Sequence, residues 1–448
     1  MTYHYADFCA PITVHLEITT KCPLECVHCY NYWRGHGCPA LNRNMKEEEG
    51  RTLIRKLSEG GIFNIIITGG EPLLNFNTLI AVAEEAKKLG IRYSLNSNII
   101  SLDEKKAKKL VELGIKNVLA SVPGVGDTYD LITQRPGAYQ IFLKKLNIAR
   151  RCGIEVTPNM VVTKKNLSQM YETASQLKKL GFKRFMSGKA ACPGNCQDFS
   201  EFMLSQIEFE EYLKTLKSVK DNLKMEVDTL SCYPLCGTDY PDDYASIILG
   251  RNCTAGVSFG AISVNGDVRP CPQIDTVYGN LFTENMFSIW KKASEWRKGE
   301  NIPDACNKCS LLKYCGGGCR MEAKMSGGNY SENDPYCRPE KISETAVKMK
   351  RKNKLFPVKE LPEFNHWEIS PYHYRKESFG GTVCLQNSDA TLLLDSDGLA
   401  VFLQFQPGKI YNFSDTIDWK GLEPKEFLSN LYQRGAIIIR GEKNEREM

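Results

Sequence analysis

Residues 12–30, ITVHLEITTKCPLECVHCY, place a strand-like run directly before a loop with three cysteines. Cys22, Cys26 and Cys29 follow the pattern C-x3-C-x2-C. Three thiolates this close together can hold three irons of a cubic iron–sulfur cluster and leave the fourth iron free, whereas electron-transfer clusters usually have four cysteines. The loop therefore predicts a cluster that binds a substrate or cofactor directly. Coincidental spacing and a zinc site are the alternatives; structural zinc prefers paired C-x2-C units and a closed shell, for which Cys38 is the candidate fourth ligand.

Up to residue 188 the chain repeats a helical stretch, a glycine and an apolar run. Glycine just past a helix end adopts the left-handed conformation that other residues resist. Strands that alternate with helices predict βαβ units and a parallel sheet. With residues 12–19 as the first strand, about six units are expected, fewer than the eight of a closed (β/α)8 barrel. We expect an α/β fold, a partial (β/α)6 barrel, with a doubly wound open sheet as the alternative. The expected joints are Gly60-Gly61, Gly90, Gly114, Gly153 and Gly181.

Polar residues follow four of the expected strands. The cysteine loop follows the first strand, and Thr68-Gly69-Gly70-Glu71-Pro72 follows the second. Asn98 lies just after the third strand and Ser121 after the fourth. Ligands of parallel α/β folds bind at the carboxyl ends of the strands, so we expect these groups on one face.

Eighteen cysteines stand out in a chain of 448 residues with an ordinary charged fraction of 25%. The first residues have no charged segment followed by an apolar stretch, so no signal peptide is expected. Tight cysteine groups without an export signal indicate metal ligands rather than disulfides, in a reducing cytoplasm. No apolar run approaches the roughly 18 residues of a membrane helix. The net charge of +5 comes without a dense basic run, so neither a membrane nor a nucleic acid is an expected partner.

Together, KCPLECVHCY at residues 21–30 and TGGEP at residues 68–72 resemble the radical S-adenosylmethionine enzymes. The resemblance covers residues 11–188. It implies a [4Fe–4S] cluster on Cys22, Cys26 and Cys29, with the amino and carboxylate groups of S-adenosylmethionine on the free iron. One electron then breaks a sulfonium C–S bond and gives a 5′-deoxyadenosyl radical that abstracts a hydrogen atom.

The resemblance also implies contacts to S-adenosylmethionine. Gly69 and Gly70 would let the backbone approach the methionyl group without a Cβ in the way. Glu71 carries a charge suited to the cofactor's ammonium. Tyr30 is placed to meet the adenine. The candidates for ribose or carboxylate contacts are Asn98 and Ser121.

The region of residues 253–337 holds a second dense set of cysteines and resembles the SPASM domain, which carries two auxiliary [4Fe–4S] clusters. The resemblance implies one cluster on four cysteines and another on three, and the second set lacks a fourth ligand. Either that cluster keeps an open iron, or Cys232 or Cys236 completes it. A double zinc ribbon is the alternative. The four cysteines are Cys306, Cys309, Cys315 and Cys337, and the three are Cys253, Cys271 and Cys319.

The last 90 or so residues lack cluster motifs. Two strands joined at Asn387-Ser388-Asp389, a helix after Asp397-Gly398 and a final helix and strand suggest a small α+β, winged-helix-like unit. It weakly resembles the element with which maturases of ribosomally made peptides bind a leader peptide at a sheet edge. A scaffold or dimerisation role is the alternative. The expected domains are 1–188 (partial barrel), 189–252 (bridge), 253–339 (SPASM), 340–360 (linker helix) and 361–448 (the C-terminal unit).

SPASM enzymes act mostly on peptides, so the resemblance implies a maturase that abstracts hydrogen from a ribosomally made precursor peptide, giving a crosslink or a backbone excision. Its expected partners are that peptide and a reductant such as flavodoxin or ferredoxin. An anaerobic sulfatase-maturing enzyme is disfavoured because Pro272 stands where that family has an aspartate. A non-enzymatic electron-transfer or scaffold protein is the third possibility. No catalytic base is predicted: the polar loop residues Asp127, Asp130 and Arg135 follow the fourth strand, but such residues are more often solvated or capping.

Overall fold

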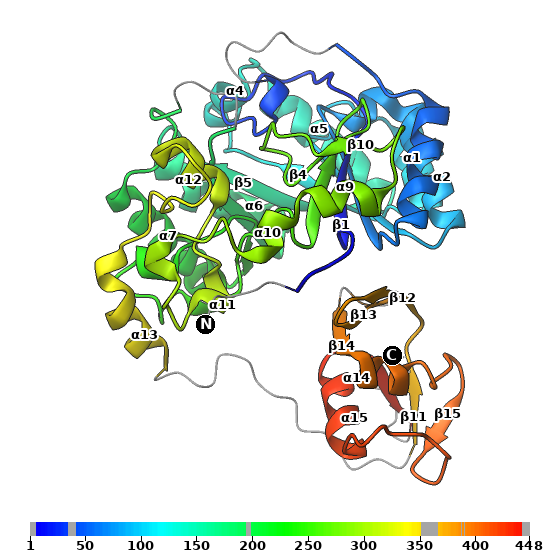
Figure 1. The fold of residues 1–448 in the computed structure, drawn as a ribbon. Helices are drawn as coiled ribbons and strands as arrows, with labels where there is room; N and C mark the ends of the chain where they lie inside the picture. Colours follow the sequence, from blue (N-terminus) through cyan, green and yellow to red (C-terminus); the bar gives the residue numbers. More distant parts are fainter. Residues whose placement is uncertain are drawn as a thin grey trace. The chain divides into compact units, whose positions relative to one another are not determined.

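The computed structural model describes residues 6–34, 42–193, 199–350, 366–386, 388 and 390–440. They divide into two compact units, one spanning Ala10–Leu355 and the other joining Ala6–Cys9 to Phe356–Met448. Figure 1 shows both units, coloured along the chain. The larger unit contains the cysteine loop and the whole second cysteine region.

A single sheet forms the centre of the larger unit, and in the described residues it has ten strands in the order β10-β9-β8-β1-β2-β3-β4-β5-β6-β7 (Figure 1). From β8 to β7 every neighbouring pair is parallel, and β9 and β10 continue the sheet in antiparallel fashion. The strands are β1 (Thr13–Glu17), β2 (Asn64–Thr68), β3 (Arg92–Ser97), β4 (Asn117–Ser121), β5 (Glu155–Val162), β6 (Arg184–Lys189), β7 (Glu226–Thr229), β8 (Phe259–Ile262), β9 (Asp267–Arg269) and β10 (Gly279–Asn280).

The strand order confirms the expected α/β class. From β1 to β7 the strands lie side by side in the order of the chain, without the reversal that creates the switch point of a doubly wound sheet. The six strands expected from the sequence are β1 to β6. Apolar runs such as NIIIT in β2 suit this position, because parallel strands are covered on both faces.

Helices connect the parallel strands as the sequence predicts. Five of the expected joint glycines, Gly61 among them, have positive φ angles between 64° and 88°, which a side chain with a Cβ resists. The apolar faces of these helices pack on the sheet, and α1 and α2 lie against one another (Figure 1). The helices are α1 (Glu47–Glu59), α2 (Phe76–Lys88), α3 (Glu104–Glu112), α4 (Asp127–Thr133), α5 (Ala138–Arg151) and α6 (Met170–Lys179).

The second cysteine region continues this unit rather than forming a separate body. Strand β8 pairs with β1 in parallel register, Thr13 opposite Phe259, and the apolar core of the barrel includes Ile262, Val268 and Trp290. The expected linker helix ends at Lys350, and its remaining residues lie outside the described part. The elements after β6, other than strands, are α7 (Gln206–Leu223), η4 (Leu235–Gly237), α8 (Ala245–Ile248), α9 (Met286–Lys292), α10 (Ser294–Lys298), η5 (Asp304–Cys306), α11 (Leu312–Cys315), α12 (Arg320–Gly327), η6 (Pro339–Lys341) and α13 (Ile342–Lys350).

The smaller unit has its own core, built around Trp367, Phe402 and Tyr411. Its described strands form two antiparallel sheets, ordered β15-β11-β16 and β12-β13-β14. The helix expected after Gly398 begins earlier, because Asp395 caps it by accepting a hydrogen bond from Gly398 N at 2.8 Å. Two residues of the expected turn, Asn387 and Asp389, lie outside the described residues. The elements are β11 (His366–Ile369), β12 (Tyr372–Glu377), β13 (Gly380–Leu385), β14 (Thr391–Asp395), α14 (Ser396–Phe402), β15 (Ile410–Asn412), α15 (Pro424–Gln433) and β16 (Ile437–Arg440).

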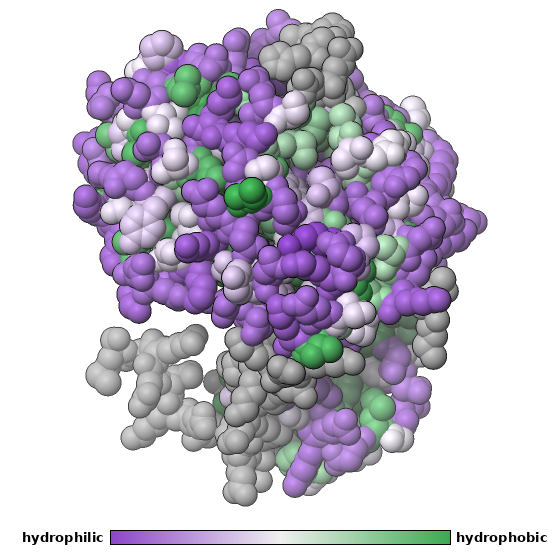
Figure 2. All heavy atoms as spheres, turned by 90° about the vertical axis from the view of Figure 1, so that its left-hand side faces the viewer, coloured by the Kyte–Doolittle hydropathy of each residue, from purple (hydrophilic) through white to green (hydrophobic). Residues whose placement is uncertain are grey.

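The face drawn in Figure 2 is mostly hydrophilic, with apolar residues scattered in small groups. Among the described helices, none combines the length and the apolar character needed to cross a lipid bilayer.

Candidate metal centres

The loop after β1 is held in place by the end of α4. The Val27 N–H donates to Ile132 O at 3.0 Å, and the Glu25 N–H donates to Thr133 O at 3.1 Å. The Arg135 guanidinium adds a hydrogen bond to Pro23 O at 3.2 Å. Two segments that are far apart in sequence therefore fix the backbone that carries the three cysteines.

Burial and nearby polar groups set the chemistry of these three thiols. Burial raises the pKa of Cys22 to about 11 and raises the pKa values of Cys26 and Cys29 as well. Burial opposes the charge of Arg34, but the thiols of Cys29 and Cys22 raise the pKa of its guanidinium. The Asn98 amide donates to Cys22 Sγ at 3.5 Å. A cation and an amide donor therefore face the thiols and would stabilise them as metal-bound thiolates.

The donor set of the loop suits a cluster. Cys22, Cys26 and Cys29 are all thiols of one turn, in which the Cys29 N–H donates to Cys26 O at 3.0 Å. A closed zinc shell needs a fourth protein ligand, and the candidate for it, Cys38, lies outside the described residues. The residues present thus fit a cubic iron–sulfur cluster.

The loop after β2 packs backbone to backbone on the cysteine loop. The Gly70 N–H donates to Thr19 O and the Glu71 N–H to Lys21 O, both at 2.7 Å. A Cβ on Gly69 would lie 2.3 Å from Thr19 O, and one on Gly70 would lie 2.2 Å from Lys21 O. The neighbouring loop by itself therefore requires glycine at both positions, and the expected approach to the methionyl group stays a prediction.

Glu71 ties the β2 loop to the end of β3. Its carboxylate is fully buried and accepts hydrogen bonds from Leu73 N at 3.0 Å, Ser97 Oγ at 2.7 Å and Asn98 N at 2.8 Å. Burial raises the pKa of Glu71, and these three donors oppose that shift. Protein donors fill three of the roughly four acceptor positions of the carboxylate. The contact to a cofactor ammonium stays a prediction, confined to the remaining position.

Further polar side chains lie at the carboxyl ends of the parallel strands, which form one rim of the sheet. One of these residues was not singled out by the sequence. The Tyr30 hydroxyl lies 3.3 Å from Thr68 Oγ1. Asn31 donates from its amide to Gly69 O at 2.9 Å, while its buried Oδ1 has no hydrogen-bond partner in the protein. Ser121 ends β4 opposite Asn159 of β5, whose Oδ1 is likewise buried without a partner. Unpaired buried oxygens are costly, so they mark places where a polar ligand can bind. Asn31 has no motif of its own and emerges only from the fold.

A buried ion pair links the cysteine loop to the second cysteine region. Glu17, at the end of β1, pairs with Arg269 at the end of β9, and both side chains are fully buried. Trp33 donates to Glu17 at 3.2 Å, and the Arg269 guanidinium lies 4.3 Å from the centre of the Tyr32 ring. Arg269 also donates to Pro272 O at 2.9 Å, next to Cys271. No motif predicts this pairing, because its two members are 252 residues apart.

Four thiols approach one another around β9 and α12. Cys232 hydrogen-bonds with Cys253, and both thiols interact electrostatically with Cys319. Cys253 also interacts with Cys271. Of the two residues left open by the sequence, Cys232 is therefore the one that interacts with Cys253 and Cys319, while Cys271 interacts with Cys253.

Cations surround this group. Arg320 faces Cys253, and Lys189, at the end of β6, faces Cys232 and Cys319. Lys189 forms a fully buried ion pair with Glu322 of α12. Burial alone would lower the pKa of Lys189, but the Glu322 carboxylate raises it. The ammonium therefore stays charged beside the thiols.

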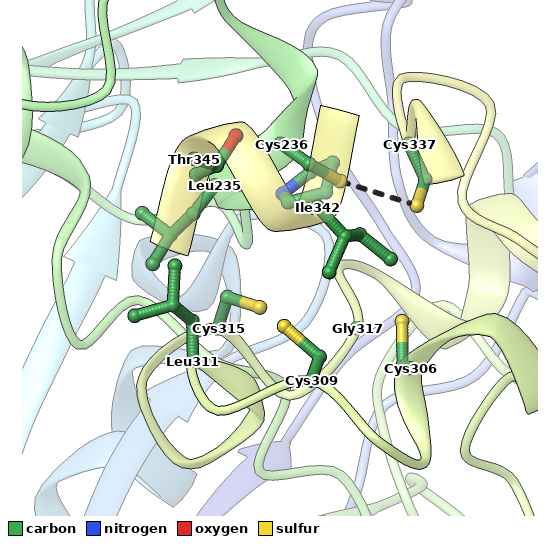
Figure 3. A pocket seen from close by; sticks show the side chains of 11 residues that line it. Leu235, Cys236, Cys306, Cys309, Leu311, Cys315, Gly317, Cys337, Ile342 and Thr345 are labelled. Atoms are coloured by element: carbon green, nitrogen blue, oxygen red, sulfur yellow. Dashed lines mark hydrogen bonds between the residues drawn. The ribbon is translucent and has the colours of Figure 1, made fainter. Parts of the chain in front are cut away.

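Away from this thiol group, a cavity is lined by Cys236 and by the four cysteines expected to hold the other auxiliary cluster (Figure 3). Its empty volume is about 300 Å³, including its opening to solvent. Cys236 Sγ lies 3.4 Å from Cys337 Sγ. The apolar side chains of Leu235, Leu311 and Ile342 complete the lining. The four expected cysteines there are Cys306, Cys309, Cys315 and Cys337.

The polar loop residues weighed as substrate-facing groups act structurally. The Asp130 carboxylate accepts hydrogen bonds from Gly137 N at 2.6 Å and Tyr139 N at 2.8 Å, so it supports the start of α5. Arg135 holds the cysteine loop, and Asp127 is the first residue of α4. The remaining cysteines within the described residues are Cys9, Cys152, Cys192 and Cys384, of which the last two are buried; Cys38 and Cys196 lie outside those residues.

Comparison with known proteins agrees with this geometry. The model of the radical SAM superfamily matches residues 16–184, and that of the SPASM iron–sulfur cluster-binding domain matches residues 253–310. The AdoMet-dependent heme synthase of Methanosarcina barkeri is 26% identical over 345 residues, which are 73% of this chain and 96% of that relative. The PqqA peptide cyclase of Bradyrhizobium diazoefficiens is 25% identical over 360 residues, 76% of this chain and 90% of that relative.

Solved structures share the fold. Native anSMEcpe with bound AdoMet has a TM-score of 0.62 at 19% identity, over 77% of this chain and 100% of that chain. Streptococcus suis SuiB bound to the precursor peptide SuiA has a TM-score of 0.60 at 17% identity, over 74% of this chain and 77% of that one. The two matching models show that the chain carries a radical SAM domain followed by a SPASM iron–sulfur domain.

Proposed function

We propose that the chain is a maturase that modifies a ribosomally made precursor peptide by radical chemistry. A [4Fe–4S] cluster on the cysteine loop would supply the one-electron reduction of S-adenosylmethionine on which hydrogen abstraction from the substrate depends. Cys22, Cys26 and Cys29 would hold that cluster. Arg34 and Asn98 would stabilise its thiolates.

The rim of the sheet would bind S-adenosylmethionine. Asn31 and Asn159 offer buried oxygens without protein partners, and Glu71 offers its remaining acceptor position. Tyr30 would meet the adenine, with its hydroxyl held near Thr68.

Two auxiliary clusters complete the proposal. The first would be held by Cys232, Cys253, Cys271 and Cys319, and the second by Cys306, Cys309, Cys315 and Cys337. All cysteines in the described residues are free thiols, which fits a reducing cytoplasm. A flavodoxin or ferredoxin would supply the electrons.

The peptide assignment rests on an open sheet edge in the smaller unit. Within the described residues β14 pairs with β13 alone, so one edge of its sheet is open, and Leu393 on this strand is 51% exposed. An extended peptide adds to such an edge through main-chain hydrogen bonds. A relative that cyclises the PqqA peptide and a fold-mate bound to a precursor peptide support the same substrate class. A heme-forming activity is the second candidate, supported by the identity to the heme synthase.

The test is anaerobic turnover with dithionite, S-adenosylmethionine and the short peptides encoded beside the gene. We expect 5′-deoxyadenosine together with a mass change in one peptide. Cys26→Ala should abolish 5′-deoxyadenosine, whereas Cys309→Ala should keep part of the cofactor cleavage and lose the peptide product. Unmodified peptides with consumption of a heme precursor would favour the second candidate, and undiminished cleavage by Cys26→Ala would contradict the cluster assignment.

A further inference from the structure

The cavity of the second auxiliary site contains five thiols, one more than the four irons of a cubic cluster can use. In the view of Figure 3, Cys306, Cys309 and Cys315 lie on one side and Cys236 and Cys337 on the other. The last two sulfurs are 3.4 Å apart, close enough to contact each other. Each iron of a cubic cluster takes one terminal thiolate, so with Cys306, Cys309 and Cys315 on three irons, Cys236 and Cys337 compete for the fourth.

The position of Cys236 is built by specific contacts. The Arg338 guanidinium donates to Cys236 O at 3.2 Å, which ties the segment of Cys236 to the residue after Cys337. A Cβ on Gly237 would lie 2.7 Å from Tyr336 O, so only glycine allows the two backbones to approach this closely.

Charges hold the same two segments together. Asp239 pairs with Arg338 at 3.2 Å and with Lys341, and Lys348 donates to Asp239 O at 2.9 Å. These contacts join the segment after η4 to η6 and to α13. Cys236 is therefore held beside Cys337 by the fold rather than placed there by chance.

We propose that Cys236 and Cys337 are interchangeable ligands of one iron of the second auxiliary cluster. The inference rests on the proposed cluster assignment. In the exchange, one Fe–S bond forms and one breaks. The incoming thiol gives its proton to the departing thiolate, and no electron is gained or lost. Cys232 does not take part, because it lies in the other thiol group beside Cys253.

The experiment measures iron released by brief ferricyanide oxidation of the anaerobically reconstituted full-length chain. An iron without a cysteine ligand is lost first, so the wild type should release about one iron per chain, from the cysteine-loop cluster. Cys236→Ala and Cys337→Ala should each match the wild type. The double variant should release about one further iron and show an added [3Fe–4S] signal by electron paramagnetic resonance.

Two controls interpret the result. Cys309→Ala removes a thiol without such a neighbour and should release the extra iron alone, whereas Cys152→Ala, outside all thiol groups, should have no effect. Extra release from either single variant at Cys236 or Cys337 would overturn the exchange, because the other thiol then does not substitute. A double variant that behaves like the wild type would overturn it as well. If Cys309→Ala also releases no extra iron, the cluster assignment itself fails, whatever the result with peptides.

Discussion

At Gly70 a single methyl group should separate the two loops of the cofactor face. The Cβ of an alanine would lie 2.2 Å from Lys21 O, so Gly70→Ala should break the hydrogen bonds to Thr19 O and Lys21 O. We expect the free energy of unfolding to fall by about 1–3 kcal/mol. Displacement of the loop should reduce 5′-deoxyadenosine formation about a hundredfold, measured anaerobically by chromatography.

The matched control is Gly114→Ala. Gly114 has a φ of +88° and open space around its Cβ position, so the alanine should cost only the strain of the left-handed conformation, about 1–2 kcal/mol. Its 5′-deoxyadenosine formation should stay at the wild-type level. Equal activity of the two variants would show that backbone contact between the loops is not what Gly70 provides.

For single residues, the sequence predicted positions in the fold more fully than hydrogen-bond partners. The strand-end rule brought Glu71 and Asn98 to one rim, where the structure has them. The protein partners were not predicted: Glu71 accepts three protein hydrogen bonds, and Asn98 donates to Cys22, while the contacts of both to the cofactor stay predictions. A motif cannot show which neighbours satisfy a buried polar group, because those neighbours come from other strands.

Strand β1 carries a histidine that makes the fold sensitive to acid. Burial lowers the pKa of His15 from 6.5 to about 4, with a smaller effect from Arg269. Between these values the unfolded chain binds one more proton than the folded chain, so stability decreases as the pH falls from 6.5 toward 4. The contribution is about 1.4 kcal/mol per pH unit.

His15→Gln should remove that dependence. Between pH 7 and pH 5 the wild type should lose about 2 kcal/mol more unfolding free energy than the variant, measured by urea denaturation. Other titrating groups are common to both chains and cancel in the difference. If the unfolding free energies of the two proteins depend on pH in the same way, His15 becomes charged as readily in the folded chain as in the unfolded chain.

The contact between β6 and α12 depends on the buried pair of Lys189 and Glu322. Lys189→Met would leave the carboxylate buried without its partner, which costs about 3–5 kcal/mol. The double variant Lys189→Met with Glu322→Met removes both charges and should recover most of that loss. The unfolding free energies of the single and the double variant are measured by denaturant unfolding of the metal-free chain. A double variant no more stable than the single one would show that packing, not charge, decides this contact.

Elements of ordinary length were predictable and short ones were not. The six central strands were confirmed because glycine joints and apolar runs mark each unit. Strands β7 to β10 contain two to four residues each, too few to show a periodicity. The pairing of β8 with β1 was missed for that reason, although it makes the cysteine-rich region part of the same sheet.

In the whole molecule, the radical SAM and SPASM portions share one core and two buried ion pairs, whereas the smaller unit has a core of its own. The resemblance to the SPASM domain predicted four of the cysteines that line a common cavity, Cys306, Cys309, Cys315 and Cys337. The fifth thiol, Cys236, could not be assigned, because it reaches that cavity from a segment 101 residues before Cys337. Long-range packing, rather than the local pattern of cysteines, therefore decides which thiols lie together.

If the smaller unit captures the peptide, its separate core should allow capture to be changed without altering the cofactor chemistry. Leu393 and Ile410 are 51% and 53% exposed on end strands of its two sheets, β14 and β15. If β14 receives the peptide, Leu393→Asp should raise the KM for the peptide at least about tenfold, equivalent to about 1.4 kcal/mol of binding, with kcat unchanged. Ile410→Asp is the matched control and should leave both constants unchanged. Cleavage of S-adenosylmethionine without peptide should be the same in all three proteins, because neither side chain belongs to the larger unit. An equal effect of both substitutions, or none, would show that the edge of β14 does not bind the peptide.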